Sequence, residues 1–234
     1  MDLLDKLNPA QRAAVSAPPG AILVVAGPGS GKTRVLTHRI AYLIREMHVS
    51  PWQIMAVTFT NKAAREMEHR IEQLLQGRPQ GLNLGTFHAI CARLLRREVD
   101  NLENYQRDFV IFDTDDQLQV VEQALAELNI DDKKNPPGKI LNGISSAKND
   151  LITAAEYQAT NYAGEVVRRV YERYQLTLQV NNAMDFDDLL MNAVLLFDAR
   201  PDVLAHYQER YAHILGDEFQ DTNATQYRLL RQLA

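Results

Sequence analysis

Residues 26–33 read Ala-Gly-Pro-Gly-Ser-Gly-Lys-Thr, a pattern typical of a phosphate-binding loop. Small residues allow backbone N–H groups to turn inward around phosphate oxygens. In this pattern Lys32 reaches the β- and γ-phosphates, and the Thr33 hydroxyl binds Mg²⁺. The other residues of the predicted phosphate-binding loop are Ala26, Gly27, Pro28, Gly29, Ser30 and Gly31. A glycine-rich turn without a ligand is the alternative, but an apolar run before the loop and a helical pattern after it favour a nucleotide site.

Two acidic residues could supply the second half of such a site. Asp217 and Glu218 follow the apolar segment 211–215, and open α/β sheets bind ligands at the carboxyl ends of strands. Asp217 is predicted to hold Mg²⁺ through water, and Glu218 to orient and deprotonate an attacking water. A solvated acidic turn is the alternative. The nucleotide hypothesis requires Lys32 and Glu218, 186 positions apart, to converge on one terminal phosphate.

Short apolar runs indicate the strands that must position these groups. Continuous apolar runs favour strands buried on both faces, as in a parallel sheet. The predicted strands are 21–25, 54–59, 82–87 and 211–215. Helical periodicity follows the first three, over 33–44, 62–75 and 88–99. This alternation predicts an α/β fold with a parallel sheet.

The middle of the chain interrupts that alternation. Residues 114–184 have helical patterning and no convincing strand, with a capping box expected at Thr114 and Gln117 and helices from about Ile140 and over 165–180. We therefore expect an all-helical insertion over 113–184, with the α/β domain formed by 1–112 and 185–234. A last amphipathic helix is predicted over 225–234.

The composition limits the classes of protein to which this chain can belong. The 234 residues are 46% hydrophobic and 24% charged, which excludes a collagen, a low-complexity chain or a disulfide scaffold. Cys91 is the only cysteine and is expected in the core. The run 21–26 is far too short to span a bilayer, so we expect no membrane and a cytoplasmic location. The net charge of −5 implies that any contact with nucleic acid is local.

Several motifs together resemble the UvrD/Rep/PcrA family of superfamily 1 DNA helicases, in their N-terminal half and with the PcrA branch most similar. They are Asp217-Glu218-Phe219-Gln220-Asp221-Thr222, the loop 26–33, and the segments 7–11, 33–43, 58–64 and 185–189. The resemblance implies a RecA-like ATP-binding domain 1A with an inserted helical domain 1B. It also implies ATP and Mg²⁺ as ligands, with ATP hydrolysis driving 3′–5′ translocation and duplex unwinding in DNA repair or replication. The implied partners are single-stranded DNA, duplex/single-strand junctions and the family's C-terminal helicase domains.

The same resemblance assigns further residues to the nucleotide. Gln11 matches the family's adenine-reading glutamine, and a carboxamide can pair with the N6/N7 edge of adenine. Arg34 matches a nucleotide contact, and Gln220 a residue that senses the γ-phosphate and relays to the DNA side. Each of these side chains could instead be an ordinary polar residue on the surface.

The resemblance also implies a DNA-contacting set, composed of Phe59, Thr60, Asn61, Lys62, Thr86 and His88. An aromatic face can stack on any base, while amides and cations can meet phosphates. Without the resemblance, Phe59 would be interpreted as a core residue and His88 as a structural one. Residues 62–97 contain seven Lys or Arg and three acids, which suits a phosphate track or a solvated helix face equally well.

Some features depart from the family or have simpler explanations. Gly216 stands where the family usually has a bulky aliphatic residue, and glycine weakens a strand. Asp185, Asp187 and Asp188 could suggest a metal cluster, but Asp185 as a helix N-cap is the simpler interpretation. The family's later motifs are absent, so we expect the isolated chain to be nearly inactive. The alternatives are a phosphate-loop ATPase of another class without DNA coupling and a non-catalytic interaction module.

Overall fold

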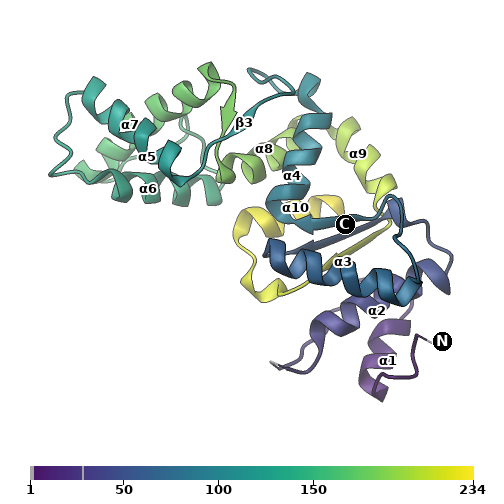
Figure 1. Cartoon of the computed structure of the whole chain (residues 1–234). Helices are drawn as coiled ribbons and strands as arrows, with labels where there is room; N and C mark the ends of the chain where they lie inside the picture. The colour runs from purple at the N-terminus through teal and green to yellow at the C-terminus, as the bar shows by residue number, and fades with distance from the viewer. Residues whose placement is uncertain (1–2, 28) are drawn as a thin grey trace. The chain divides into compact units, whose positions relative to one another are not determined.

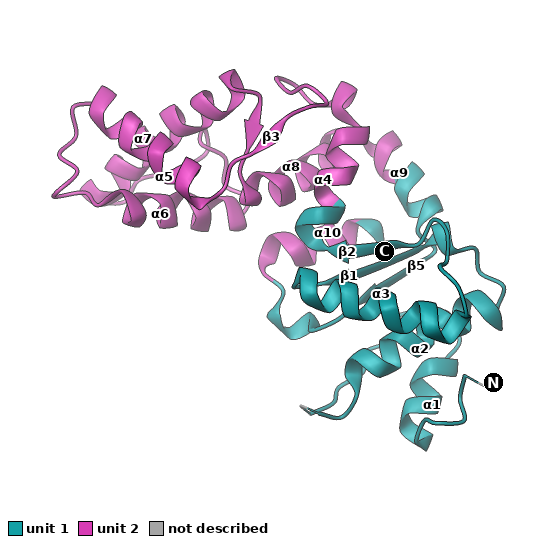
Figure 2. Ribbon diagram, viewed as in Figure 1, with its two compact units in different colours: residues 1–90, 205–222, 233–234 teal, residues 91–204, 223–232 magenta. Residues whose placement is uncertain are grey.

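The computed structural model describes residues 3–27 and 29–234, which form two compact units (Figures 1 and 2). Of the described residues, the first unit comprises 3–27, 29–90, 205–222 and 233–234, and the second comprises 91–204 and 223–232. The chain therefore crosses between them inside helix α4 (Phe87–Arg97), inside helix α9 (Pro201–Arg210), after Thr222 and after Gln232. Pro28 of the predicted phosphate loop lies outside the described residues.

The first unit is built on a parallel three-stranded sheet of order β2-β1-β5. Its strands are β1 (Ile54–Thr58), β2 (Asn83–Thr86) and β5 (His213–Gly216). In the register, Ala56 lies opposite Leu84 on one side and Leu215 on the other. Its helices and turns are α1 (Pro9–Ser16), α2 (Lys32–Arg45), α3 (Asn61–Leu75) and the 3₁₀ turns Pro51–Gln53 and Phe219–Asp221. The prediction of a mixed α/β fold with a parallel sheet is confirmed.

The alternating direction of side chains along β1 shows which helices cover one face of the sheet. Ile54 and Ala56 pack in one core cluster with Ile40 of α2 and Met67 and Ile71 of α3. Successive side chains of a strand point to opposite faces, so α2 and α3 cover one face of the sheet. All five residues of β1 are buried, as expected for a central strand with helices against the sheet.

The second unit is mainly helical. It contains α5 (Thr114–Glu127), α6 (Pro137–Asn149), α7 (Tyr162–Val180), α8 (Phe186–Ala199) and α10 (Ala224–Leu233), with a 3₁₀ turn at Val99–Asn101. Its apolar core joins α5, α6 and α7 through Val121, Ile144 and Tyr174, each with no exposed surface. No helix among the described residues is long and apolar enough to cross a membrane.

The predicted strand 21–25 is wrong. Residues 21–27 have no regular secondary structure, and Leu23 and Val25 are 73% and 88% exposed. A buried strand needs a neighbour along its edge as well as apolar side chains. Residues 21–25 pair with no described strand, neither with the central β1, which already pairs with β2 and β5, nor along the outer edges of β2 and β5.

Two smaller expectations for the middle of the chain also need correction. Helix α5 is capped by Asp113, one residue before the expected Thr114, because its carboxylate accepts from the backbone N–H groups of Asp115 and Asp116. Asp116 completes the capping box in place of Gln117. A two-residue strand β4 (Ala183–Met184) pairs in parallel with β3 (Val110–Ile111). Two residues are too few for periodicity to reveal.

Candidate functional site

The carboxyl ends of the parallel strands bring the predicted functional residues to one edge of the sheet. Asp217 follows β5, Phe59 follows β1 and Phe87 follows β2. The backbone N–H of Asp217 donates to the carbonyl of Val57 at 3.1 Å, which extends the pairing of β5 with β1 by one residue. This edge is where open α/β sheets place their ligands.

Lys32 and Glu218 lie together at this edge. The Lys32 Nζ is 3.9 Å from Glu218 Oε2 and 3.4 Å from the carbonyl oxygen of Ala26. Their side chains remain 25% and 40% exposed. The pair is close enough for attraction but too long for a hydrogen bond, so both groups can still engage a ligand.

Thr33 and Asp217 form a second contact between the loop and the strand end. The Thr33 hydroxyl donates to Asp217 Oδ2 at 3.1 Å, and Asp217 is buried. A hydroxyl and a carboxylate side by side offer the oxygen ligands that Mg²⁺ prefers. No cluster of three or more His, Cys, Asp or Glu that could hold a metal occurs within 3–27 and 29–234.

The loop approaches helix α1 closely at Gly31. This residue is the N-cap of α2 and has φ of +88°, and a Cβ placed on it would lie 3.1 Å from Gln11 Nε2. Gln11 Nε2 donates to the carbonyl of Ser30 at 3.0 Å, and Gln11 Oε1 accepts from the backbone N–H of Asn8. The predicted adenine-reading residue therefore lies beside the loop, with its carboxamide held at both ends.

Arg39 holds α1 against α2, a role that was not predicted from the sequence. Its guanidinium is buried and donates to the carbonyl of Val15 at 2.8 Å, near the end of α1. Burial lowers the pKa of Arg39 from its ordinary value. The signal was available, because Arg39 lies four residues after Val35 on the apolar side of the helix.

The segment after Asp217 has an uncommon backbone. Glu218 has φ of +50°, in the left-handed region that non-glycine residues seldom adopt. Gln220 Nε2 donates to the Glu218 carboxylate and, at 3.2 Å, to Asp221 Oδ2. The turn therefore places the Gln220 carboxamide against the Glu218 carboxylate, and that carboxylate in turn lies near Lys32.

The remaining loop candidates differ in their surroundings. Ser30 Oγ donates to the carbonyl of Gly27 at 2.6 Å, which closes the loop on itself. Gly29 also has a left-handed backbone, with φ of +73°. Arg34 donates to the carbonyl of Lys6 at 2.5 Å, so its guanidinium is used within the first unit.

The predicted DNA-contacting residues divide into exposed and buried groups. Thr60, Asn61 and Lys62 are exposed, and the Thr60 hydroxyl caps α3 by accepting from the N–H of Ala63. Phe59 is half-buried and packs edge-to-face on the buried Phe87, with ring centroids 5.7 Å apart. His88 is half-buried, whereas Thr86 is buried and its hydroxyl accepts from the N–H of Ala89.

Charge on α3 is unevenly compensated. Arg70 pairs with Glu66, and Arg78 pairs with Glu68 and Glu72, so all three acids of residues 62–97 are engaged. Within the described residues, Lys62 and Arg65 have no ion-pair partner. The positive charge therefore concentrates in the first turn of α3, next to Phe59, where the helix dipole adds to it.

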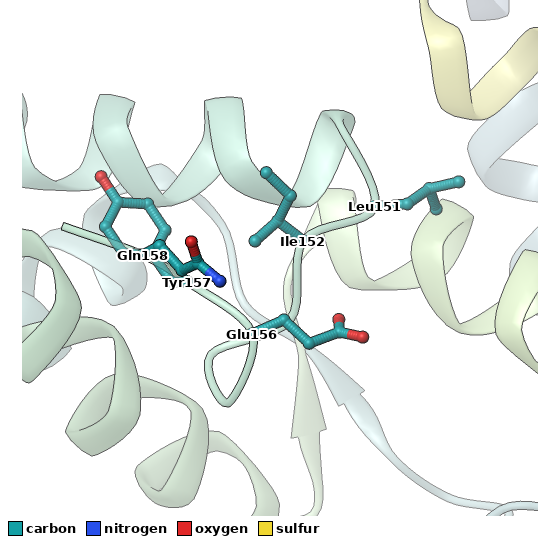
Figure 3. A pocket seen from close by; sticks show the side chains of 5 residues that line it. All are labelled: Leu151, Ile152, Glu156, Tyr157 and Gln158. Atoms are coloured by element: carbon teal, nitrogen blue, oxygen red, sulfur yellow. The ribbon is translucent and has the colours of Figure 1, made fainter. Parts of the chain in front are cut away.

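The second unit has a shallow hollow of about 450 Å³, lined by Leu151, Ile152, Glu156, Tyr157 and Gln158 (Figure 3). Its ionisable carboxylate, Glu156, already accepts hydrogen bonds from the N–H and hydroxyl of Thr153. The one carboxylate of this lining is therefore already hydrogen-bonded within the second unit.

Comparison with known proteins gives a consistent result. The model of the UvrD/REP helicase N-terminal domain matches residues 7–234. The ATP-dependent DNA helicase PcrA of Bacillus subtilis (strain 168) is 51% identical over 99% of this chain, and that of Staphylococcus aureus (strain Mu50) is 47% identical over the same share. The chain spans 32% of the length of each relative. This chain therefore belongs to the UvrD/REP helicase N-terminal domain family.

Proposed function

We propose that this chain is the N-terminal ATP-binding portion of an ATP-dependent 3′–5′ DNA helicase that translocates on single-stranded DNA and unwinds duplex in repair or replication. The observation that carries this proposal is the meeting of Lys32 with Glu218 and of Thr33 with Asp217 at one sheet edge. A loop that no longer bound a nucleotide would not require these four side chains to lie together. The PcrA relatives are named as ATP-dependent DNA helicases.

Each side chain has a role that its position suits. The Lys32 ammonium would neutralise charge on the β- and γ-phosphates, and the N-terminus of α2 would point its positive end at the same oxygens. Glu218 would accept the proton of the attacking water as a general base. Gln220, which donates to Glu218, would hold that carboxylate in orientation and respond to the γ-phosphate.

The Thr33 hydroxyl would bind Mg²⁺, and Asp217, whose Oδ2 lies 3.1 Å from that hydroxyl, would hold the ion through water. When bound, Mg²⁺ would supply positive charge to the phosphate oxygens. Asp217 is buried and anchored to β1 through its own N–H, so its carboxylate is held in place before any ligand arrives.

Nucleotide binding can be tested on this chain by fluorescence anisotropy with labelled ATP and Mg²⁺. We expect Lys32→Ala to weaken binding at least tenfold. The matched control is Lys139→Ala, since Lys139 is an exposed lysine of α6 in the other unit. Retained binding in Lys32→Ala would show that the site is misplaced.

The DNA side of the proposal rests on the exposed first turn of α3 and on Phe59. A half-buried ring beside Lys62 and Arg65 suits a stacked base with its phosphates nearby. We expect Phe59→Ala to weaken binding of a labelled single-stranded oligonucleotide, whereas Trp52→Ala, at the opposite end of the same strand, should not. Equal effects of both variants, or no binding at all, would favour an ATPase without DNA coupling.

We further propose that the α/β part is a RecA-like domain 1A, that 113–184 forms the inserted helical domain 1B, and that C-terminal helicase domains complete the nucleotide site. Arginine side chains supplied to a phosphoryl group contribute about 10³–10⁵ in rate. The 234-residue chain is therefore expected to bind ATP weakly and hydrolyse it very slowly. Strong DNA-stimulated turnover by this chain would contradict that expectation.

A further inference from the structure

Helix α1, in the first unit, is short and carries no charge at its carboxyl end. It has eight residues, well below the length at which an isolated helix is stable in water. Its last turn, residues 13–16, consists of two alanines, a valine and a serine. The last carbonyl groups of a helix have no partner within it and need a donor from elsewhere. The carboxyl end of α1 therefore depends on its neighbours in the fold.

Arg39 of α2 supplies such a donor. Its Nη1 donates to the Val15 carbonyl at 2.8 Å, and both residues are buried. A cation at the carboxyl end of a helix also meets the negative end of the helix dipole. Val15 shares a small apolar cluster with Val35, and Arg39 follows Val35 by about one turn of α2. Arg39 and Val35 therefore hold the same end of α1 from one face of α2.

Gln11 lies on the same face of α1 as Val15. The two residues are four apart in the sequence, a spacing that places side chains above one another on a helix. Gln11 Nε2 donates to the Ser30 carbonyl at 3.0 Å, so this residue attaches α1 to the phosphate loop. Only one helical turn separates this attachment from the bond at Val15. A displacement of α1 at Val15 would therefore displace the Gln11 side chain as well.

The Gln11 carboxamide retains hydrogen-bonding capacity that suits adenine. A carboxamide has two N–H donors and an oxygen with two lone pairs. Among the described residues, one donor goes to the Ser30 carbonyl and one lone pair accepts from the Asn8 N–H. One donor and one acceptor remain, which are the groups that N7 and the N6 amine of adenine require. Guanine has acceptors at both N7 and O6, so the remaining acceptor of Gln11 would face another acceptor.

We infer that Arg39 is a positioning residue that determines the preference of the site for adenine, acting through α1 to hold Gln11 beside the phosphate loop. The inference rests on the proposed function, with Gln11 as the residue that reads the base. The proposed phosphate ligands, Lys32 and Thr33, belong to α2 itself rather than to α1. Loss of the Arg39 contact should therefore weaken recognition of the base and leave recognition of the phosphates unchanged.

The test compares Arg39→Met with Arg45→Met. Methionine keeps a long, unbranched apolar side chain in the buried position and removes the donor. Arg45 is the last residue of α2, at the opposite end from the loop, and its guanidinium pairs with the adjacent Glu46. The dissociation constants of ATP, GTP and inorganic tripolyphosphate, each with Mg²⁺, are measured by titration calorimetry. Tripolyphosphate has no base, so its binding reports on the phosphate site alone.

We expect the wild type to bind ATP about tenfold more tightly than GTP, as one well-placed pair of hydrogen bonds to a base allows. In Arg39→Met this ratio should fall to about twofold through weaker binding of ATP, while the Kd of tripolyphosphate stays unchanged. Arg45→Met should keep the wild-type ratio. Circular dichroism checks the folding of each variant. Arg39→Lys keeps the charge on a side chain one bond shorter, and it should lower the ratio by about half if Arg39→Met does not fold.

A double variant tests whether Arg39 acts through Gln11. Gln11→Ala should remove the preference for ATP by itself. Adding Arg39→Met to Gln11→Ala should then change the ATP Kd by less than about twofold, because effects that pass through one contact are not additive. Additive losses would mean that Arg39 acts by another route and would overturn the inference.

An unchanged ratio of ATP to GTP affinity in the folded Arg39 variants would also overturn the inference, as would equal weakening of ATP and tripolyphosphate in them. Failure of the proposed function gives a different result, because the wild type would then bind neither ATP nor tripolyphosphate. Equal wild-type affinities for ATP and GTP would leave the phosphate site in place and would overturn the roles of Gln11 and Arg39 together.

Discussion

Two groupings of lysine with carboxylate differ in nearly every physical respect. Lys32 is 3.9 Å from Glu218, and both side chains keep substantial exposure to water. Lys148 contacts Asp185 and Asp188 at hydrogen-bond distance, and all three side chains are almost completely buried. The first pair has unused hydrogen-bonding capacity, whereas the second uses its capacity within the fold.

The difference shows which kind of charge pair can serve a ligand. An exposed pair at a sheet edge costs little to rearrange when phosphate arrives, because water already solvates both groups. A buried pair cannot open without leaving a charge in an apolar interior. We therefore expect substitutions in the buried cluster to affect folding, and substitutions in the exposed pair to affect binding.

Lys148→Ala should have the largest effect on stability. It leaves two buried carboxylates without a counter-charge, and removing one partner of a buried ion pair costs about 3–5 kcal/mol. Urea unfolding followed by circular dichroism measures this loss, with Lys139→Ala as the exposed control. A loss below about 1 kcal/mol would show that the cluster does not hold the helical unit together.

The sequence could have revealed this cluster more fully than it did. Asp185 was predicted as a helix N-cap, and the structure confirms it, with Asp188 completing the capping box. No partner was predicted for it at Lys148, although this lysine lies four residues after the buried Ile144. A lysine on the apolar side of a helix indicates a buried partner, but the partner is 37 residues away and only the fold identifies it.

Asp188→Asn should change how stability depends on pH. Burial and the neighbouring Asp185 raise the pKa of Asp188 to about 6, against the attraction of Lys148. Because the folded pKa lies above the unfolded value, the stabilising contribution of this group is complete below about pH 4 and is lost as the pH rises through about 6. The titratable groups around it are Lys148, Asp185, Tyr105, Tyr171 and Tyr174.

The free energy of unfolding of the wild type relative to Asp188→Asn should therefore fall between about pH 4 and pH 6 and level off at higher pH. One protonation difference changes stability by at most about 1.4 kcal/mol per pH unit. Asp132→Asn, which removes an exposed carboxylate, serves as the control. A difference that stays level or rises with pH would contradict the assignment.

The candidate site was easier to predict than the strand that leads into it. The loop motif and the acidic pair are local patterns, and their chemistry required Lys32 and Glu218 to meet. The apolar run 21–25 indicated burial, but a strand also requires a partner edge, which the run itself cannot specify. Strands β1, β2 and β5 were predicted within two residues at each end, because they pair with one another.

Gly216→Ala tests whether the strand before Asp217 is weakened by its glycine. A Cβ at this position would lie 3.6 Å from Val57 Cγ2, an ordinary contact, and Gly216 is not among the residues with a left-handed backbone. Alanine should therefore stabilise the first unit by about 0.5–1 kcal/mol through lower chain entropy in the unfolded state. Thermal unfolding measures the gain, and a lower midpoint would mean that β5 needs the smaller residue.

Lys32→Ala should change the free energy of unfolding least. This small change would distinguish the exposed pair most clearly from the buried cluster around Lys148. Exposed ion pairs contribute little because water and salt screen them, so the free energy of unfolding should fall by no more than about 0.5 kcal/mol. The urea titration used for Lys148→Ala measures both lysines under the same conditions. A loss above about 1.5 kcal/mol would make Lys32 a structural residue like Lys148. A negligible loss of stability together with weakened nucleotide binding would mean that Lys32 contributes to binding and not to the stability of the fold. A side chain that is not needed for stability is free to bind phosphate.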